Sequence, residues 1–115
     1  MFQMKLYIYR LEGCKTCLKR QPQHNKLASY LSQLNIEVQG VLFGMVNGER
    51  IDPLPEHDRL CRKDDDPMKY QAPVYIFETD DAAVKLPDLG KYNSIEEYVN
   101  AMIAIVQQAT SEETT

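Results

Sequence analysis

Residues 5–17 read KLYIYRLEGCKTC, and this stretch decides how the rest of the chain is interpreted. Its first half, from Lys5 to Arg10, is rich in aromatic and β-branched side chains and apolar through its middle, which predicts a β-strand buried on both faces. Gly13 breaks this pattern, and the cysteines Cys14 and Cys17 follow, separated by two residues. The stretch therefore predicts a strand that ends just before a Cys-x-x-Cys pair.

The residues after this pair predict a helix and then a second strand. From residue 15 to residue 34 the apolar side chains recur at roughly helical intervals, which indicates a helix of about five turns. Pro22 lies inside it and should bend the helix or restart it, because proline removes one backbone donor and clashes with the preceding turn. Residues 36–43 alternate at first and are then continuously apolar, which suits a strand parallel to the first. These three predicted elements together form a βαβ unit.

The second half of the chain predicts a hairpin and a closing helix. Residues 73–77 and 82–86 are strand-like and are separated by the turn-prone residues 79–81, which indicates an antiparallel hairpin. Ser94 and Glu97 form a capping box ahead of a one-sided apolar pattern. We therefore expect one α/β domain over residues 1–110, with a four-stranded mixed sheet flanked by helices and a disordered tail over residues 111–115.

The middle of the chain has no continuous helical or strand-like pattern. Glycine and proline interrupt residues 44–72, and we expect a short helix over residues 55–62 with Asp52 as its cap. Asp64 to Asp66 form a charged run that should be solvated. Residues 45–68 are more than a minimal core requires, so this insertion is a candidate for partner specificity.

The spacing of the two cysteines points to sulfur chemistry. At the start of a helix the Cys14 sulfur would face unpaired amides and the positive end of the helix dipole, and Lys15, Lys19 and Arg20 add positive charge nearby. These features favour a thiolate. Cys17 lies one helical turn further on, within reach of Cys14 but turned toward the protein. We expect Cys14 to attack a disulfide and Cys17 to resolve the mixed disulfide.

Four features together resemble the thioredoxin and glutaredoxin superfamily. The Cys14–Cys17 motif follows a strand, Pro22 comes five residues after Cys17, Pro73 opens a later strand, and the order of elements ends in a hairpin and a capped helix. The resemblance implies a thioredoxin-like fold and a protein-disulfide oxidoreductase. It also implies that the Ala72–Pro73 bond is cis, that this segment lies against the Cys14 sulfur, and that Lys15, Thr16, Ala72 and Pro73 contact the substrate.

The chain also departs from that superfamily at several positions. It lacks the additional N-terminal strand and helix of thioredoxins and is closer to a glutaredoxin in size. Gly13 stands where thioredoxins carry tryptophan. Between the cysteines, Lys15 and Thr16 match neither the Gly-Pro of thioredoxins nor the Pro-Tyr of typical glutaredoxins. Gly90 stands alone where glutaredoxins have a glycine pair that holds glutathione.

A second hypothesis assigns the cysteines to a non-enzymatic thioredoxin-fold binding module. Cys14, Cys17, His57 and Cys61 would form a Cys₃His set for zinc or iron, with His57 and Cys61 spaced as ligands on one helical face. Taken alone, Cys61 is interpreted as a spectator thiol. His24 is expected on the solvated side of the first helix and His57 in a surface loop, and neither is given a catalytic role.

The composition and the net charge of the chain limit the classes of partner that we expect. The 115 residues include 17 acidic and 13 basic side chains, and the net charge of −4 gives no reason to expect nucleic acid or an anionic membrane as partner. No apolar run approaches the ~20 residues of a membrane span, and the start does not resemble a secretory signal. We expect a cytoplasmic monomer that acts on disulfide-containing proteins and is recycled by a reductase or glutathione. It would need no metal and no cofactor beyond its own disulfide.

Overall fold

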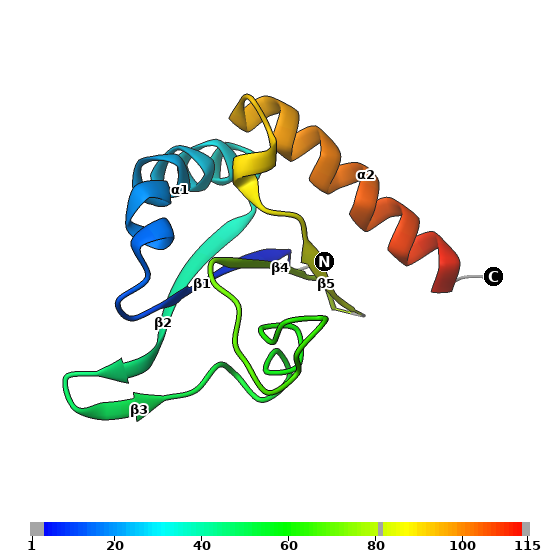
Figure 1. Cartoon of the computed structure of the whole chain (residues 1–115). Helices are drawn as coiled ribbons and strands as arrows, with labels where there is room; N and C mark the ends of the chain where they lie inside the picture. Colours follow the sequence, from blue (N-terminus) through cyan, green and yellow to red (C-terminus); the bar gives the residue numbers. More distant parts are fainter. Residues whose placement is uncertain (1–3, 81, 114–115) are drawn as a thin grey trace.

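The strand predicted from residues 5–10 lies at the centre of a five-stranded mixed sheet (Figure 1). The computed structural model describes residues 4–80 and 82–113. The strands are β1 (Lys5–Leu11), β2 (Glu37–Val46), β3 (Glu49–Ile51), β4 (Val74–Glu78) and β5 (Ala83–Leu86), in the spatial order β3-β2-β1-β4-β5. The helices are α1 (Lys15–Gln33), the short 3₁₀ helix η1 (Leu89–Lys91) and α2 (Ile95–Glu113). The chain is therefore α/β, as expected.

Strand pairing follows the predicted scheme around β1. β1 pairs in parallel with β2 and antiparallel with β4, and β4 pairs antiparallel with β5. α1 connects the two parallel strands. The βαβ unit and the hairpin predicted from the sequence are both confirmed.

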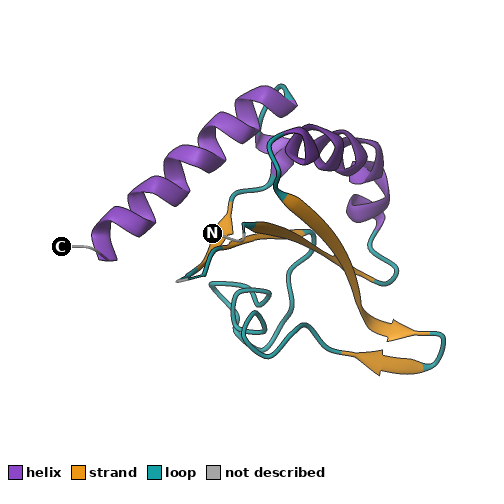
Figure 2. Cartoon of the chain, turned by 180° about the vertical axis from the view of Figure 1, so that it is seen from behind, coloured by secondary structure: helices purple, strands orange, loops and turns teal. Residues whose placement is uncertain are grey.

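Different segments cover the two faces of the sheet. Successive side chains along each strand point to opposite faces. Leu6 and Ile8 of β1 point to the face that α1 and α2 cover, whereas Tyr7 and Tyr9 point to the face that residues 52–72 cover with turns and loops (Figure 2). We call these the helix face and the loop face. The helix-face core consists of Leu6, Ile8, Leu27, Leu31, Ile36, Tyr75, Phe77, Leu86, Leu89, Tyr98, Val99 and Met102. The loop-face core consists of Tyr7, Tyr9, Phe43, Cys61, Val74 and Ile76.

The prediction of four strands was wrong, because a fifth strand, β3, extends the sheet. β2 continues to Val46 and then reverses through Asn47 and Gly48, whose φ angles are 52° and 82°. An Asn-Gly pair with positive φ at both positions is the favoured two-residue hairpin turn. β3 is three residues long and pairs only with the end of β2.

Three other expectations differ from the structure. Residues 55–62 form successive turns rather than a helix, although the Cys61 amide donates to the carbonyls of His57 and Asp58. α1 runs without interruption through Pro22, so the helix does not restart there. α2 reaches Glu113, within the segment expected to be a disordered tail, and residues 114–115 lie outside the described part.

Half of the predicted capping box at the start of α2 is formed. The Glu97 amide donates to the Ser94 hydroxyl at 3.1 Å, and the Glu97 carboxylate accepts from the Asn93 amide at 3.2 Å. The second bond thus engages the residue before Ser94, whereas a complete capping box engages the amide of the N-cap residue itself. Within the described chain, no helix combines the length and the apolar character that crossing a bilayer would require.

Candidate functional site

Cys14 lies immediately before α1, where the chain leaves the sheet. Gly13 has a φ of 82°, a left-handed conformation that glycine adopts without steric cost, and it turns the chain out of β1. Cys14 is the N-cap residue of α1, and its Sγ accepts a hydrogen bond from the Cys17 amide at 3.1 Å. The Cys14 sulfur therefore replaces the side-chain oxygen that usually caps a helix, and it faces the positive end of the helix dipole.

Cys17 lies one turn further into the helix and is buried, with 4% of its surface exposed. Burial is the main cause that raises the pKa of the Cys17 thiol to about 11, and the hydrogen bond with Cys14 raises it further. Cys17 is therefore protonated at neutral pH, whereas the partly exposed Cys14 is accessible from outside. The roles of attacking and resolving cysteine stay predictions, and they require a difference in exposure of this kind.

The segment before β4 approaches the Cys14 sulfur. The Ala72–Pro73 peptide bond is cis, as the resemblance implied, and Cys14 Sγ lies 4.0 Å from the Ala72 carbonyl oxygen. Lys15 and Thr16 are exposed on the first turn of α1. The four residues expected to contact a substrate thus lie next to the two cysteines in sequence or in space.

A pocket of about 240 Å³ opens beside the two cysteines. Leu11, Leu18 and Leu42 supply apolar surface, and Arg10 and Glu12 add one charge of each sign. Leu18 is 72% exposed. The surface around Cys14 is therefore partly apolar and accessible.

His24 lies on the helix face, not in solvent as predicted from the sequence. It is 4% exposed, and its Nε2 is 2.7 Å from the hydroxyl of Tyr75, which is 1% exposed. Burial, followed by the positive charges of Arg10 and Arg20, lowers the pKa of His24 to about 4. His24 is seven residues after Cys17 and seven before Leu31, so these three buried residues share one side of α1. This seven-residue spacing is the feature of the sequence that could have indicated a buried His24.

His57 was also predicted in solvent and is also buried, on the loop face. Its side chain is fully enclosed, with Nδ1 2.6 Å from the Tyr9 hydroxyl and Nε2 2.5 Å from Glu78 Oε2. Both ring nitrogens are occupied. Burial raises the pKa of Tyr9 well above its usual range. No motif in the sequence indicates this Tyr–His–Glu chain.

The proposed metal ligands do not come together. Cys61 is fully buried in the loop-face core, where burial raises the pKa of its thiol to about 12, and His57 already uses both nitrogens. Among residues 4–80 and 82–113, no three His, Cys, Asp or Glu side chains are grouped as metal ligands would be. The Cys₃His set is not formed.

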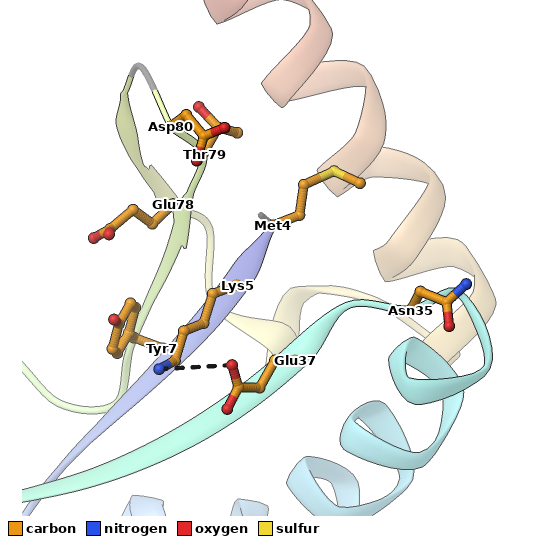
Figure 3. Close-up of a pocket in the computed structure, with 8 residues that line it drawn as sticks. All are labelled: Met4, Lys5, Tyr7, Asn35, Glu37, Glu78, Thr79 and Asp80. Atoms are coloured by element: carbon orange, nitrogen blue, oxygen red, sulfur yellow. Dashed lines mark ion pairs between the residues drawn. The ribbon is translucent and has the colours of Figure 1, made fainter. Parts of the chain in front are cut away.

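A larger pocket, of about 530 Å³, lies at the opposite end of β1 from Cys14. Figure 3 shows side chains from β1, β2 and β4 around it, with an ion pair between Lys5 and Glu37. Lys5 Nζ is 3.8 Å from Glu37 Oε2 and 4.9 Å from the centre of the Tyr7 ring. The lysine charge is thus already matched within the chain, and the pocket contains no cysteine.

The candidate site is therefore the Cys14–Cys17 pair with the Ala72–Pro73 segment beside it. No protein-family model, no curated protein and no solved structure matches this chain.

Proposed function

We propose that this protein is a thiol–disulfide oxidoreductase with a thioredoxin-like fold. The observation that carries the proposal is the geometry at the start of α1. The Cys14 sulfur caps the helix, accepts the Cys17 amide at 3.1 Å and is accessible, while Cys17 is buried one turn behind it. A helix N-terminus stabilises negative charge on sulfur, and a second thiol one turn away can close a disulfide.

The reaction would proceed in two exchanges. The Cys14 thiolate attacks one sulfur of a substrate disulfide, forming a Cys14–substrate bond and releasing the other sulfur as a thiolate. Cys17 then attacks the Cys14 sulfur, and its proton passes to the second departing thiolate. The substrate disulfide gains two electrons and becomes one thiol and one thiolate, which takes its proton from water. The cysteine pair loses two electrons and becomes the Cys14–Cys17 disulfide.

The raised pKa of Cys17 explains why Cys14 reacts with the substrate first. A thiol with a pKa of about 11 is a poor nucleophile at neutral pH, so it does not compete with Cys14 for the substrate. It becomes effective only when Cys14 holds a mixed disulfide within bonding distance. An intramolecular attack of this kind has a high effective concentration, which compensates for the small thiolate fraction.

An extended polypeptide segment is the substrate that the surface favours. The Ala72 backbone, exposed Lys15 and Thr16, and the leucine-lined pocket surround the Cys14 sulfur. Backbone hydrogen bonds along a strand-like segment give affinity without demanding one sequence. A reductase or glutathione would return the disulfide to the dithiol, and a reducing compartment such as the cytoplasm suits this cycle.

Reduction of insulin disulfides with dithiothreitol tests the proposal. The wild-type chain should accelerate the reaction, Cys14→Ser should abolish the acceleration, and Cys17→Ser should accumulate a covalent adduct between Cys14 and the insulin chain. Cys61→Ala is the matched control, because it removes a buried thiol away from the pair and should retain activity. A wild-type chain without acceleration, and a Cys17→Ser variant without adduct, would instead favour a non-enzymatic binding module.

A further inference from the structure

The outer side of α1 carries three lysines in one row. Lys15, Lys19 and Lys26 are spaced by four and then seven residues, so they lie on the same side of a helix with about 3.6 residues per turn. All three are exposed, whereas the buried residues of α1 lie on its opposite side. The row begins next to Cys14 and runs along the helix for about 16 Å.

The charges of these lysines are not matched within the chain. The sequence of α1 contains no aspartate and no glutamate. Arg20, the other basic residue of this helix with a permanent charge, has Asp88 Oδ1 3.8 Å from its Nε. Among the described residues, no carboxylate forms an ion pair with Lys15, Lys19 or Lys26. The positive charge on this side of α1 is therefore open to a partner.

The rest of the chain has the opposite charge balance. The net charge is −4, and the sequence of α2 contains four glutamates and no lysine or arginine. An acidic partner is therefore repelled by the chain as a whole and attracted by the outer side of α1. Such a local attraction orients a partner and raises its rate of association.

The start of the lysine row also has apolar surface beside it. Leu18 follows Cys14 by four residues and is 72% exposed. Together with two other leucines it lines the pocket of about 240 Å³ beside the cysteines, where Arg10 and Glu12 contribute opposite charges. An apolar centre with charged residues at its edge is the usual composition of a protein–protein interface.

We propose that the outer side of α1 is the docking surface for an acidic polypeptide, the partner whose disulfide Cys14 attacks. Carboxylates of this partner lie along Lys15, Lys19 and Lys26. The identity of the partner rests on the proposed function, because the polypeptide is taken to be the one that exchanges disulfides with Cys14. A thiolate by itself repels an acidic disulfide, so a preference for acidic partners has to come from the surface around Cys14.

Thiol exchange with activated peptides tests this preference. The Cys17→Ser chain, in which Cys14 reacts alone, is mixed with a blocked peptide whose central cysteine carries a 2-pyridylthio group. Cys14 forms a disulfide with the peptide cysteine, and the released pyridine-2-thiolate takes a proton from water and is measured by its absorbance. One peptide has glutamates for about five residues on each side of its cysteine, enough to reach along the lysine row when extended. The other peptide has glutamines at these positions.

The two rates should differ in dilute buffer and converge at high salt. The glutamate peptide should react about fivefold faster or more, because the lysine row attracts it. In sodium chloride at about 1 M, where charges are screened beyond about 3 Å, the ratio of the two rates should approach one. Equal rates in dilute buffer, or a ratio that salt leaves unchanged, would overturn the proposal.

Two charge reversals and one control, each combined with Cys17→Ser, locate the docking surface. Lys19→Glu and Lys26→Glu should each lower the ratio of the two rates about threefold. The ratio is informative because a change in the reactivity of Cys14 itself affects both peptides equally. Lys63→Glu makes the same charge change at an exposed residue on the loop face and should keep the original ratio. If Lys63→Glu lowers the ratio as much as the other two, the preference comes from net charge and the docking surface is excluded.

A binding measurement separates this proposal from the proposed function. The reduced wild-type chain is titrated at constant ionic strength with the glutamate peptide in which alanine replaces the cysteine, and its backbone amides are followed by NMR. Saturable shifts centred on residues 15–26 support the docking surface, even if insulin reduction shows no acceleration. Shifts spread over the whole chain, or none, would overturn it. Tighter binding of single-stranded DNA of equal charge to the same residues would overturn the assignment to a polypeptide.

Discussion

Two buried histidine–tyrosine pairs lie on opposite faces of the sheet and are built differently. On the loop face, His57 lies between the Tyr9 hydroxyl and the Glu78 carboxylate, so both ring nitrogens are bonded. On the helix face, His24 bonds only Tyr75 through Nε2, and its Nδ1 has no partner in the described chain. The first pair is complete within the protein, and the second has one nitrogen without a partner among the described residues.

This difference separates a histidine that fixes the position of a segment from one that does not. A polar network buried with every member satisfied holds its segments in one arrangement. His57 does this for residues 52–72, which have neither helix nor strand to fix them on the sheet. His24 lies within a long helix that packing already fixes, so its unmatched nitrogen contributes little to the fold.

The largest expected effect is the loss of His57. His57→Ala should lower the free energy of unfolding by about 3–5 kcal/mol, because it opens a cavity and leaves the buried Tyr9 hydroxyl and the partly buried Glu78 carboxylate without their partner. Urea denaturation measures the change. Arg59→Ala, in the same segment but exposed, is the control and should change the stability by less than about 0.5 kcal/mol. A small loss for His57→Ala would show that the segment is held by its apolar contacts alone.

The lowered pKa of His24 should make the free energy of unfolding depend on pH. Its folded-state pKa of about 4 lies below the value near 6.5 expected for the unfolded chain, so between these values the unfolded state binds more protons. The free energy of unfolding should therefore fall as the pH falls from 6.5 to 4, by about 3 kcal/mol from this residue. Above pH 6.5 and below pH 4 this contribution does not change.

A variant isolates the histidine from the carboxylates. The pKa of Asp58 is lowered by its hydrogen bonds with Tyr70 and Arg62, so acid also removes stability through this residue. His24→Gln cannot titrate, and its stability should depend less steeply on pH between 6.5 and 4 than that of the wild type. Parallel curves for the two chains would mean that His24 titrates normally and is not buried.

Part of this arrangement could be predicted from the sequence. Apolar runs and the capping box predicted the βαβ unit, the hairpin and α2, because each depends on neighbouring residues. β3 was missed because it has three residues, two of them charged, and only Asn47-Gly48 signalled its turn. The Cys14–Cys17 pair was found because its geometry is local to one helical turn.

Both histidines were misplaced for the opposite reason. His24 bonds a tyrosine 51 residues away, and His57 bonds one 48 residues away. Such partners come together only through strand order and face, which periodicity within one segment does not specify. A histidine has no preference strong enough to indicate burial by itself.

The smallest expected effect compares the two tyrosine hydroxyls directly. Tyr9→Phe should destabilise the fold by about 1–2 kcal/mol, because it leaves His57 Nδ1 enclosed without a partner. Tyr75→Phe should cost about 1 kcal/mol, because it removes one neutral hydrogen bond from a residue that the packing of α1 already holds in place. Both changes remove one oxygen from a fully buried ring, so they are matched in volume. If urea denaturation gives Tyr75→Phe the larger loss, the helix-face pair is the structural one.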